Sequence, residues 1–96
     1  MAEKWKDGLT DKLCEAFLTL ETVDEMYAFL GDMATIGEVK ALAQRLEVAR
    51  LLNENKTYPQ IAQQTGASTA TISRVKKFLD YGANGYRIVL ERMYKE

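Results

Sequence analysis

The chain of 96 residues contains no histidine, one cysteine and one proline. Without histidine, the commonest general base and the commonest zinc ligand are both missing. A hydrolase built on a Ser–His or Cys–His pair is therefore excluded, and we expect no metal site, no cofactor and no enzymatic activity. The single cysteine, Cys14, excludes an internal disulfide. Because it lies within an apolar helical pattern, we expect it to be a small buried side chain.

Long apolar runs are also missing. None reaches the ~18 residues that a bilayer-spanning helix needs, and the start, MAEKWKDGL, is charged and lacks the apolar centre of a signal peptide. We therefore expect a soluble, cytoplasmic protein with no membrane partner. Hydrophobic residues make up 47% of the chain, which is too many for a disordered protein. The length fits one domain over residues 1–96.

Charge is distributed unevenly along the chain, although the net charge is only −1. Residues 1–40 carry nine acidic and four basic side chains, whereas residues 41–96 carry five acidic and nine basic ones. Between Ser68 and Leu79 there are three cations, Arg74, Lys76 and Lys77, and no acid. Because screening limits charge effects to about 10 Å, a local basic face matters more to a nucleic acid than the net charge does.

Helix signals dominate the pattern, and strand signals are poor. Apolar residues recur at helical spacing, and capping boxes begin at Thr22, Thr35 and Thr57. We predict an all-α fold with six helices, at about residues 10–20, 23–33, 36–54, 58–65, 68–79 and 86–95. The first two predicted helices hold more aromatic and Met side chains than a small domain easily buries. They pack either against a second copy of the chain or into a tight monomeric core.

Residues 57–79 meet the requirements of a helix-turn-helix motif. The first helix needs a small residue at the crossing point, which Ala62 supplies, and an apolar anchor, which Ile61 supplies. The tight turn needs a residue that accepts a positive φ, and Gly66 stands there. Ser68 is a good N-cap for the second helix, whose Ile72 and Val75 are spaced to face inward.

The outward face of the second helix then suits the major groove of double-stranded DNA. Its first turns carry short side chains that can approach base edges, and its later turns carry cations that suit phosphates. The helix N-terminus also offers N–H groups to a phosphate. The candidate DNA-binding residues are Ser68, Thr69, Ala70, Thr71, Ser73, Arg74, Lys76 and Lys77.

The segments IAQQTGAST and ATISRVKKFL, preceded by a long helix ending in ARLL, resemble the tryptophan repressor family over about residues 34–80. The resemblance implies an intertwined, all-α homodimer whose paired recognition helices read successive major grooves about one DNA turn apart. Carried over by position, Thr69, Ala70 and Ser73 would face bases, and Thr71 a phosphate. The family's base-reading arginine of the first motif helix is replaced by Pro59.

The resemblance also implies a site for tryptophan between two arginines and the recognition helix. Arg74 corresponds to one arginine, and the other falls at Gln44 or Arg45. However, Val75 stands where the family has a glycine that leaves room for the indole, and Phe78 replaces a small polar residue. The possible effector pocket therefore consists of Gln44, Arg45, Arg74 and Val75, and we predict that tryptophan does not bind there.

Two functional hypotheses remain. The first is a homodimeric, sequence-specific DNA-binding transcriptional regulator, which the motif spacing and the acid-free recognition helix favour. The second is a protein-interaction module that retains the helix-turn-helix fold without binding an operator, which the low net charge and Pro59 favour. Salt-dependent affinity for DNA distinguishes the two.

Overall fold

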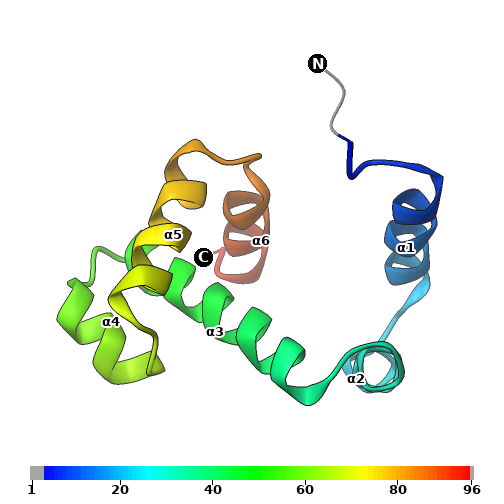
Figure 1. Ribbon diagram of the computed structural model, residues 1–96, viewed down its shortest axis with the longest axis horizontal. Helices are drawn as coiled ribbons and strands as arrows, with labels where there is room; N and C mark the ends of the chain where they lie inside the picture. The colour runs from blue at the N-terminus through cyan, green and yellow to red at the C-terminus, as the bar shows by residue number, and fades with distance from the viewer. Residues whose placement is uncertain (1–3, 96) are drawn as a thin grey trace. The chain divides into compact units, whose positions relative to one another are not determined.

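The structure, a computed structural model, describes residues 4–95 and consists there of six α-helices joined by short turns (Figure 1). The helices are α1 (Gly8–Thr19), α2 (Val23–Met33), α3 (Ile36–Asn53), α4 (Tyr58–Thr65), α5 (Thr69–Tyr81) and α6 (Gly85–Met93). The all-α fold with six helices is thus confirmed. The chain forms two compact units, Met1–Ile36 and Gly37–Glu96. The single domain over residues 1–96 stays a prediction.

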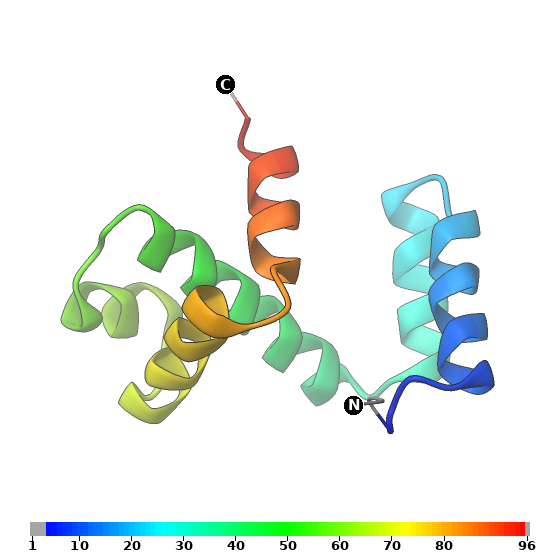
Figure 2. The same cartoon turned by 90° about the horizontal axis from the view of Figure 1, so that it is seen from above.

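The first unit contains the helical hairpin of α1 and α2, which lie side by side in Figure 2. Helix α1 begins at Gly8, earlier than predicted, because the Asp7 side chain accepts a hydrogen bond from the Thr10 N–H at 2.8 Å. Thr22 caps α2 in the same way. The rings of Phe17 and Phe29 meet edge to face, with centroids 5.4 Å apart, and join the two helices.

Neither α1 nor α2 contains a buried residue. The side chains of Leu9 and Leu18 are 82% and 85% exposed, and Val23 and Tyr27 are also exposed. Cys14 is exposed as well, so the expectation of a buried cysteine was wrong. The helical pattern around it was read correctly, but a helical pattern does not show whether a side chain on it is buried.

The second unit contains the hydrophobic core. Leu51, Ile61, Ile72 and Val48 are its largest fully buried side chains, and each contributes roughly 1.5–3 kcal/mol by leaving water. They come from α3, α4 and α5, and Leu90 of α6 completes the cluster. The C-terminal half of α3 is therefore the centre against which α4, α5 and α6 pack.

Polar residues shape the turn between α3 and α4. Asn55 adopts a left-handed conformation with φ 64°, and the N–H of Lys56 donates to the carbonyl of Leu51 at 3.0 Å. In the last turns of α3, Arg50 bridges Glu47 at 2.6 Å and Glu54 at 2.7 Å. The hydrogen bond from Arg50 lowers the pKa of the Glu47 carboxyl below its ordinary value. These contacts stabilise the C-terminal end of α3, the helix that contributes Val48 and Leu51 to the core.

The connection from α5 to α6 depends on Gly82 and Asn84. A Cβ atom at Gly82 would clash with the carbonyl oxygen of Phe78, so glycine is required where the chain leaves α5. Asn84 has φ 71° and precedes α6.

Helix α5 ends two residues later than predicted and α6 ends at Met93 rather than residue 95. Within residues 4–95, no helix has the length and hydropathy to cross a bilayer.

Candidate nucleic-acid interface

Helices α4 and α5 form the predicted helix-turn-helix. Thr57 and Gln60 make a complete capping box at the start of α4, with bonds of 3.3 Å and 2.9 Å in the two directions. Pro59 occupies the first turn of α4, where its missing N–H costs no helical hydrogen bond. Gly66 ends the helix with φ 74°, as the turn requires. The local chemistry of the motif was therefore read correctly from the sequence.

The inner faces of the two helices meet in the core. Ile61 of α4 and Ile72 of α5 are fully buried, and Val75 is only 2% exposed. Ala67 in the turn is also buried. Behind them, the side-chain amide of Gln44 in α3 donates to the Thr65 carbonyl at 3.1 Å and ties α3 to the end of α4. These contacts fix α5 in orientation and leave its opposite face in solvent.

The exposed face of α5 begins with short side chains. Thr69, Ala70 and Ser73 are exposed, whereas Thr71 is half-buried. The Ser68 hydroxyl accepts from the Thr71 N–H at 3.1 Å and so acts as the predicted N-cap. It also donates to the Thr71 hydroxyl at 3.1 Å. The first turn of α5 therefore presents small groups that allow close approach to another surface.

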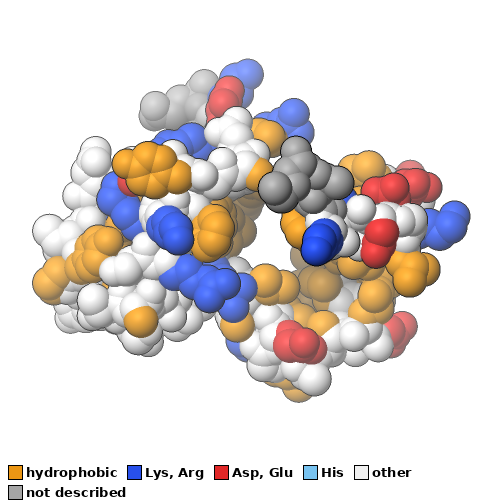
Figure 3. Space-filling model, turned by 45° about the horizontal axis from the view of Figure 1, so that its top comes forward, with side chains coloured by type: hydrophobic (Ala, Val, Ile, Leu, Met, Phe, Trp, Pro, Cys, Tyr) orange, Lys and Arg blue, Asp and Glu red, His pale blue; other side chains and the backbone are white. Residues whose placement is uncertain are grey.

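Cations follow one to two turns later. Arg74 and Lys77 are exposed and lie over the Phe78 ring, each with its charged group 5.9 Å from the ring centroid. Among residues 4–95, no carboxylate lies within ion-pair distance of either cation. Figure 3 shows Lys and Arg side chains gathered on the surface of the second unit. Two predicted DNA-binding cations are thus available to an anion.

Lys76 differs from these two cations because it is paired within its own helix. Its ammonium group lies 2.9 Å from Asp80 Oδ2, and this hydrogen bond raises the pKa of Lys76. Asp80 also lies 3.4 Å from the guanidinium of Arg87 in α6. The acid-free run noted in the sequence ends just before Asp80, whose carboxylate reaches back one turn. The spacing of four residues between Lys76 and Asp80 was a visible signal of this pair.

The candidate effector residues are brought together in part. A recess of about 350 Å³ is lined by Arg45, Thr71, Arg74, Val75, Phe78 and Tyr86. Arg45 rather than Gln44 therefore faces α5 from α3, because the Gln44 amide is engaged with Thr65. The sequence reasoning missed Tyr86, which reaches the recess from α6. No local signal marks it, since its position depends on the packing of α6 against α5.

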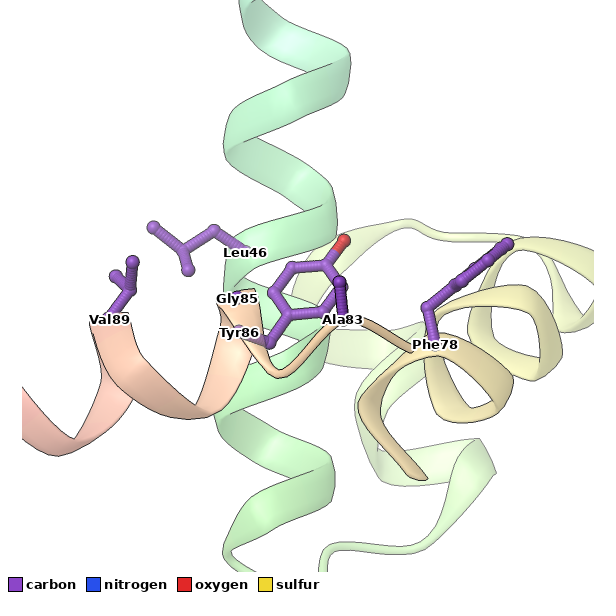
Figure 4. Close-up of a pocket in the computed structure, with 6 residues that line it drawn as sticks. All are labelled: Leu46, Phe78, Ala83, Gly85, Tyr86 and Val89. Atoms are coloured by element: carbon purple, nitrogen blue, oxygen red, sulfur yellow. The ribbon is translucent and has the colours of Figure 1, made fainter. Parts of the chain in front are cut away.

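A second, apolar recess of about 480 Å³ lies between α3 and the α5–α6 connection. It is lined by Leu46, Phe78, Ala83, Gly85, Tyr86 and Val89. In Figure 4 the Tyr86 ring lies in the middle of this group, with Leu46 on one side and Phe78 on the other. Tyr86 and Phe78 line both recesses.

Comparisons with known proteins agree with this geometry. The family model described as Trp repressor protein matches residues 9–94. The chain is 52% identical to the uncharacterized protein YerC of Bacillus subtilis (strain 168) over 91 residues, which cover 95% of this chain and 88% of YerC.

Two solved structures have the same fold. A candidate Trp repressor from Staphylococcus aureus matches with a TM-score of 0.92 and 45% identity, covering 97% of this chain and 93% of that one. A TrpR-like protein from Eubacterium eligens ATCC 27750 matches with a TM-score of 0.92 and 49% identity, covering 96% and 95% of the two chains. The chain therefore belongs to the Trp repressor family, whose members are DNA-binding regulators and not enzymes.

Proposed function

We propose that the protein is a cytoplasmic, homodimeric transcriptional regulator that recognises a specific sequence in double-stranded DNA and does not depend on tryptophan. The observation that carries this proposal is the division of α5 into two faces. Ile72 and Val75 are buried on one face, while Ser73, Arg74 and Lys77 are exposed on the other. A helix fixed in this way can enter the major groove without moving its core.

Base reading falls to the beginning of α5. Thr69, Ala70 and Ser73 are short and exposed, so base edges can come close to the helix. Hydroxyl groups bond to bases as donors or acceptors, and the methyl groups of Ala and Thr suit the thymine methyl. Ser68 and Thr71 form the capped first turn, where backbone N–H groups and the Thr71 hydroxyl suit a phosphate.

Phosphate binding falls to the cations of the later turns. Arg74 and Lys77 have no carboxylate partner among residues 4–95. Both make cation–π contacts with the Phe78 ring. Each phosphate contact releases condensed counterions, so each adds to affinity and to its salt dependence. Lys76 belongs to the same candidate set, although Asp80 holds it in the free protein.

A second copy of this chain is the partner that best fits the first unit. No residue of the α1–α2 hairpin is buried, and its Leu9 and Leu18 are exposed. An exposed apolar surface of this kind is typical of a protein–protein interface. Residues 1–36 have a net charge of −5, and residues 37–96 have a net charge of +4. Packing of the first unit of one copy on the second unit of another would bury apolar surface and bring opposite charges together.

Tryptophan independence rests on Val75 and Phe78. Val75 is part of the core and also lines the recess between Arg45 and Arg74. Its methyl groups take room that an indole ring would need. We expect calorimetric titration of the purified protein with L-tryptophan to give no saturable heat. Saturable binding at micromolar concentration would contradict this part of the proposal.

The DNA-binding proposal is tested by selecting genomic DNA fragments with the purified protein at about 0.15 M salt. We expect enrichment of a short palindrome whose half-sites lie about one DNA turn apart. Arg74→Ala should then reduce the slope of log affinity against log salt by about 0.9, the loss of one phosphate contact. Arg92→Ala, which removes an exposed cation of α6, is the matched control and should leave the slope unchanged.

Failure of this test has a definite meaning. If the folded protein enriches no sequence and shows no salt-dependent affinity, the proposed function is wrong. The protein-interaction hypothesis then takes its place, and a protein partner should be recovered with α5 at the contact.

A further inference from the structure

The exposed surface of α5 includes two parallel rows of side chains. Positions separated by four and three residues lie above one another on a helix. One row is Ala70, Arg74, Lys77 and Tyr81, and the other is Thr69, Ser73, Lys76 and Asp80. The two cations of the first row have no carboxylate partner among residues 4–95. The second row ends in an ion pair.

That ion pair belongs to a network across three helices. The two carboxylate oxygens of Asp80 serve different cations, with Lys76 at 2.9 Å and Arg87 of α6 at 3.4 Å. Arg87 also donates to the Asn53 side chain at the end of α3, at 3.3 Å. The Asp80 side chain is only 30% exposed. Its carboxylate is therefore held in place from α6 while it binds the ammonium group of Lys76.

We propose that Asp80 limits the affinity of the protein for the DNA backbone by keeping Lys76 from phosphate. This inference rests on the proposed function of α5 as a recognition helix. A phosphate and the Asp80 carboxylate compete for the same ammonium group, and the carboxylate adds a negative charge beside the incoming phosphate. Phosphate contacts strengthen binding to every sequence alike, whereas base contacts distinguish sequences. Withholding one phosphate contact therefore weakens binding to every sequence alike, and the protein then depends more on its base contacts to stay on DNA.

The first test compares the wild-type protein with Asp80→Asn on a mixed-sequence DNA duplex of about three helical turns. Affinity is measured by fluorescence anisotropy between about 50 and 200 mM salt. Asp80→Asn should steepen the slope of log affinity against log salt by about 0.9, the value for one additional phosphate contact. An unchanged slope in a folded Asp80→Asn protein would overturn the inference.

A double-mutant cycle separates release of Lys76 from a general change of charge. Lys76→Ala should alter the slope little in the wild-type background, but in the Asp80→Asn background it should remove the whole gain. Glu91→Gln is the matched control, because it removes one exposed carboxylate from α6 without touching Lys76. If Glu91→Gln steepens the slope as much as Asp80→Asn does, the effect is general and the inference fails.

Arg87→Gln tests whether loosening of α6 could produce the same result. This change breaks the contact of Asp80 with α6 and leaves the Lys76–Asp80 pair in place. We expect its salt slope to match that of the wild-type protein. A slope as steep as that of Asp80→Asn would assign the effect to α6 and overturn the inference.

The experiment also distinguishes failure of the two proposals. If the wild-type protein binds the duplex and Asp80→Asn has the same slope, the inference alone is wrong. If neither the wild-type protein nor any variant binds the duplex at about 50 mM salt, the DNA-binding function is wrong and the inference falls with it.

Discussion

The two units of this chain are both helical, but among residues 4–95 the buried hydrophobic side chains all belong to the second unit. In α4 and α5, Ile61 and Ile72 are fully buried, and each helix begins with a side-chain N-cap. In α1 and α2, the caps are equally well formed, yet no residue is buried. Helical pattern and capping therefore do not report whether a helix finds its packing partner within the same chain. The apolar side chains of α1 and α2 are exposed, whereas those of α4 and α5 form part of a hydrophobic interior.

The largest effect should come from the interior of the second unit. Ile61→Ala removes a fully buried side chain and leaves a cavity, so we expect a loss of about 3 kcal/mol in the free energy of unfolding. Urea denaturation followed by circular dichroism measures it. Gln63→Ala, an exposed change in the same helix, is the control. A loss below about 1 kcal/mol would mean that Ile61 is not part of a packed core.

Val75→Gly should have the next largest effect on stability. It removes a buried side chain and places glycine inside a helix, together costing on the order of 2 kcal/mol. Val75→Ala separates the two contributions, because it removes most of the side chain without freeing the backbone. Thermal unfolding of the three proteins provides the comparison. Equal melting temperatures for Val75→Gly and the wild-type protein would contradict the core position of Val75.

A different outcome is expected in the first unit, where exposed leucines should affect association. The double change Leu9→Ser and Leu18→Ser should raise the dissociation constant of the homodimer at least tenfold, or about 1.4 kcal/mol. Sedimentation velocity over a range of concentrations measures this. Lys12→Ser in the same helix is the control. A wild-type protein that is monomeric, or a dissociation constant that does not change, would mean that no second copy covers these side chains.

The smallest effect concerns the ion pair in α3. The hydrogen bond from Arg50 lowers the pKa of Glu47 in the folded state. The pair therefore stabilises the folded protein fully at pH values above 4.5, the ordinary pKa of a Glu side chain. That stabilisation is lost as pH falls through the lower, folded-state pKa.

Since the Glu47 side chain is 43% exposed, we expect the contribution to stay below about 1 kcal/mol. Glu47→Gln should therefore weaken the loss of stability between about pH 5 and pH 3. Urea denaturation at each pH, with Glu91→Gln as the control, measures this. If Glu47→Gln leaves the pH profile unchanged, the pair contributes nothing to stability.

Much of the recognition motif could be predicted because its determinants are local. The hydroxyl of Thr57, the positive φ of Gly66 and the N-cap at Ser68 each depend on residues within four positions. The buried positions of Ile72 and Val75 followed from helical spacing once the motif was recognised. The DNA contacts of the candidate residues remain predictions, as does the homodimer.

Other features depended on packing between distant segments. Cys14 was expected to be buried because it lies in an apolar helical pattern, but the structure has it exposed. Such a pattern shows which face of a helix is apolar, but it does not show which surface packs against that face. The choice between Gln44 and Arg45 as the residue facing α5 depended on the register of α3 against α4, which the Gln44–Thr65 bond reveals. The contribution of Tyr86 to the recess depended on where α6 returns.

The sequence by itself determined six helices, their caps and the turn that makes α4 and α5 a helix-turn-helix, because short-range hydrogen bonds and backbone preferences decide these features. It also placed Asp80 one turn after Lys76. Only the tertiary structure decided that Arg87 of α6 contacts the other oxygen of that carboxylate and that no residue of α1 or α2 is buried. Both facts depend on which surfaces meet, and no local pattern encodes that.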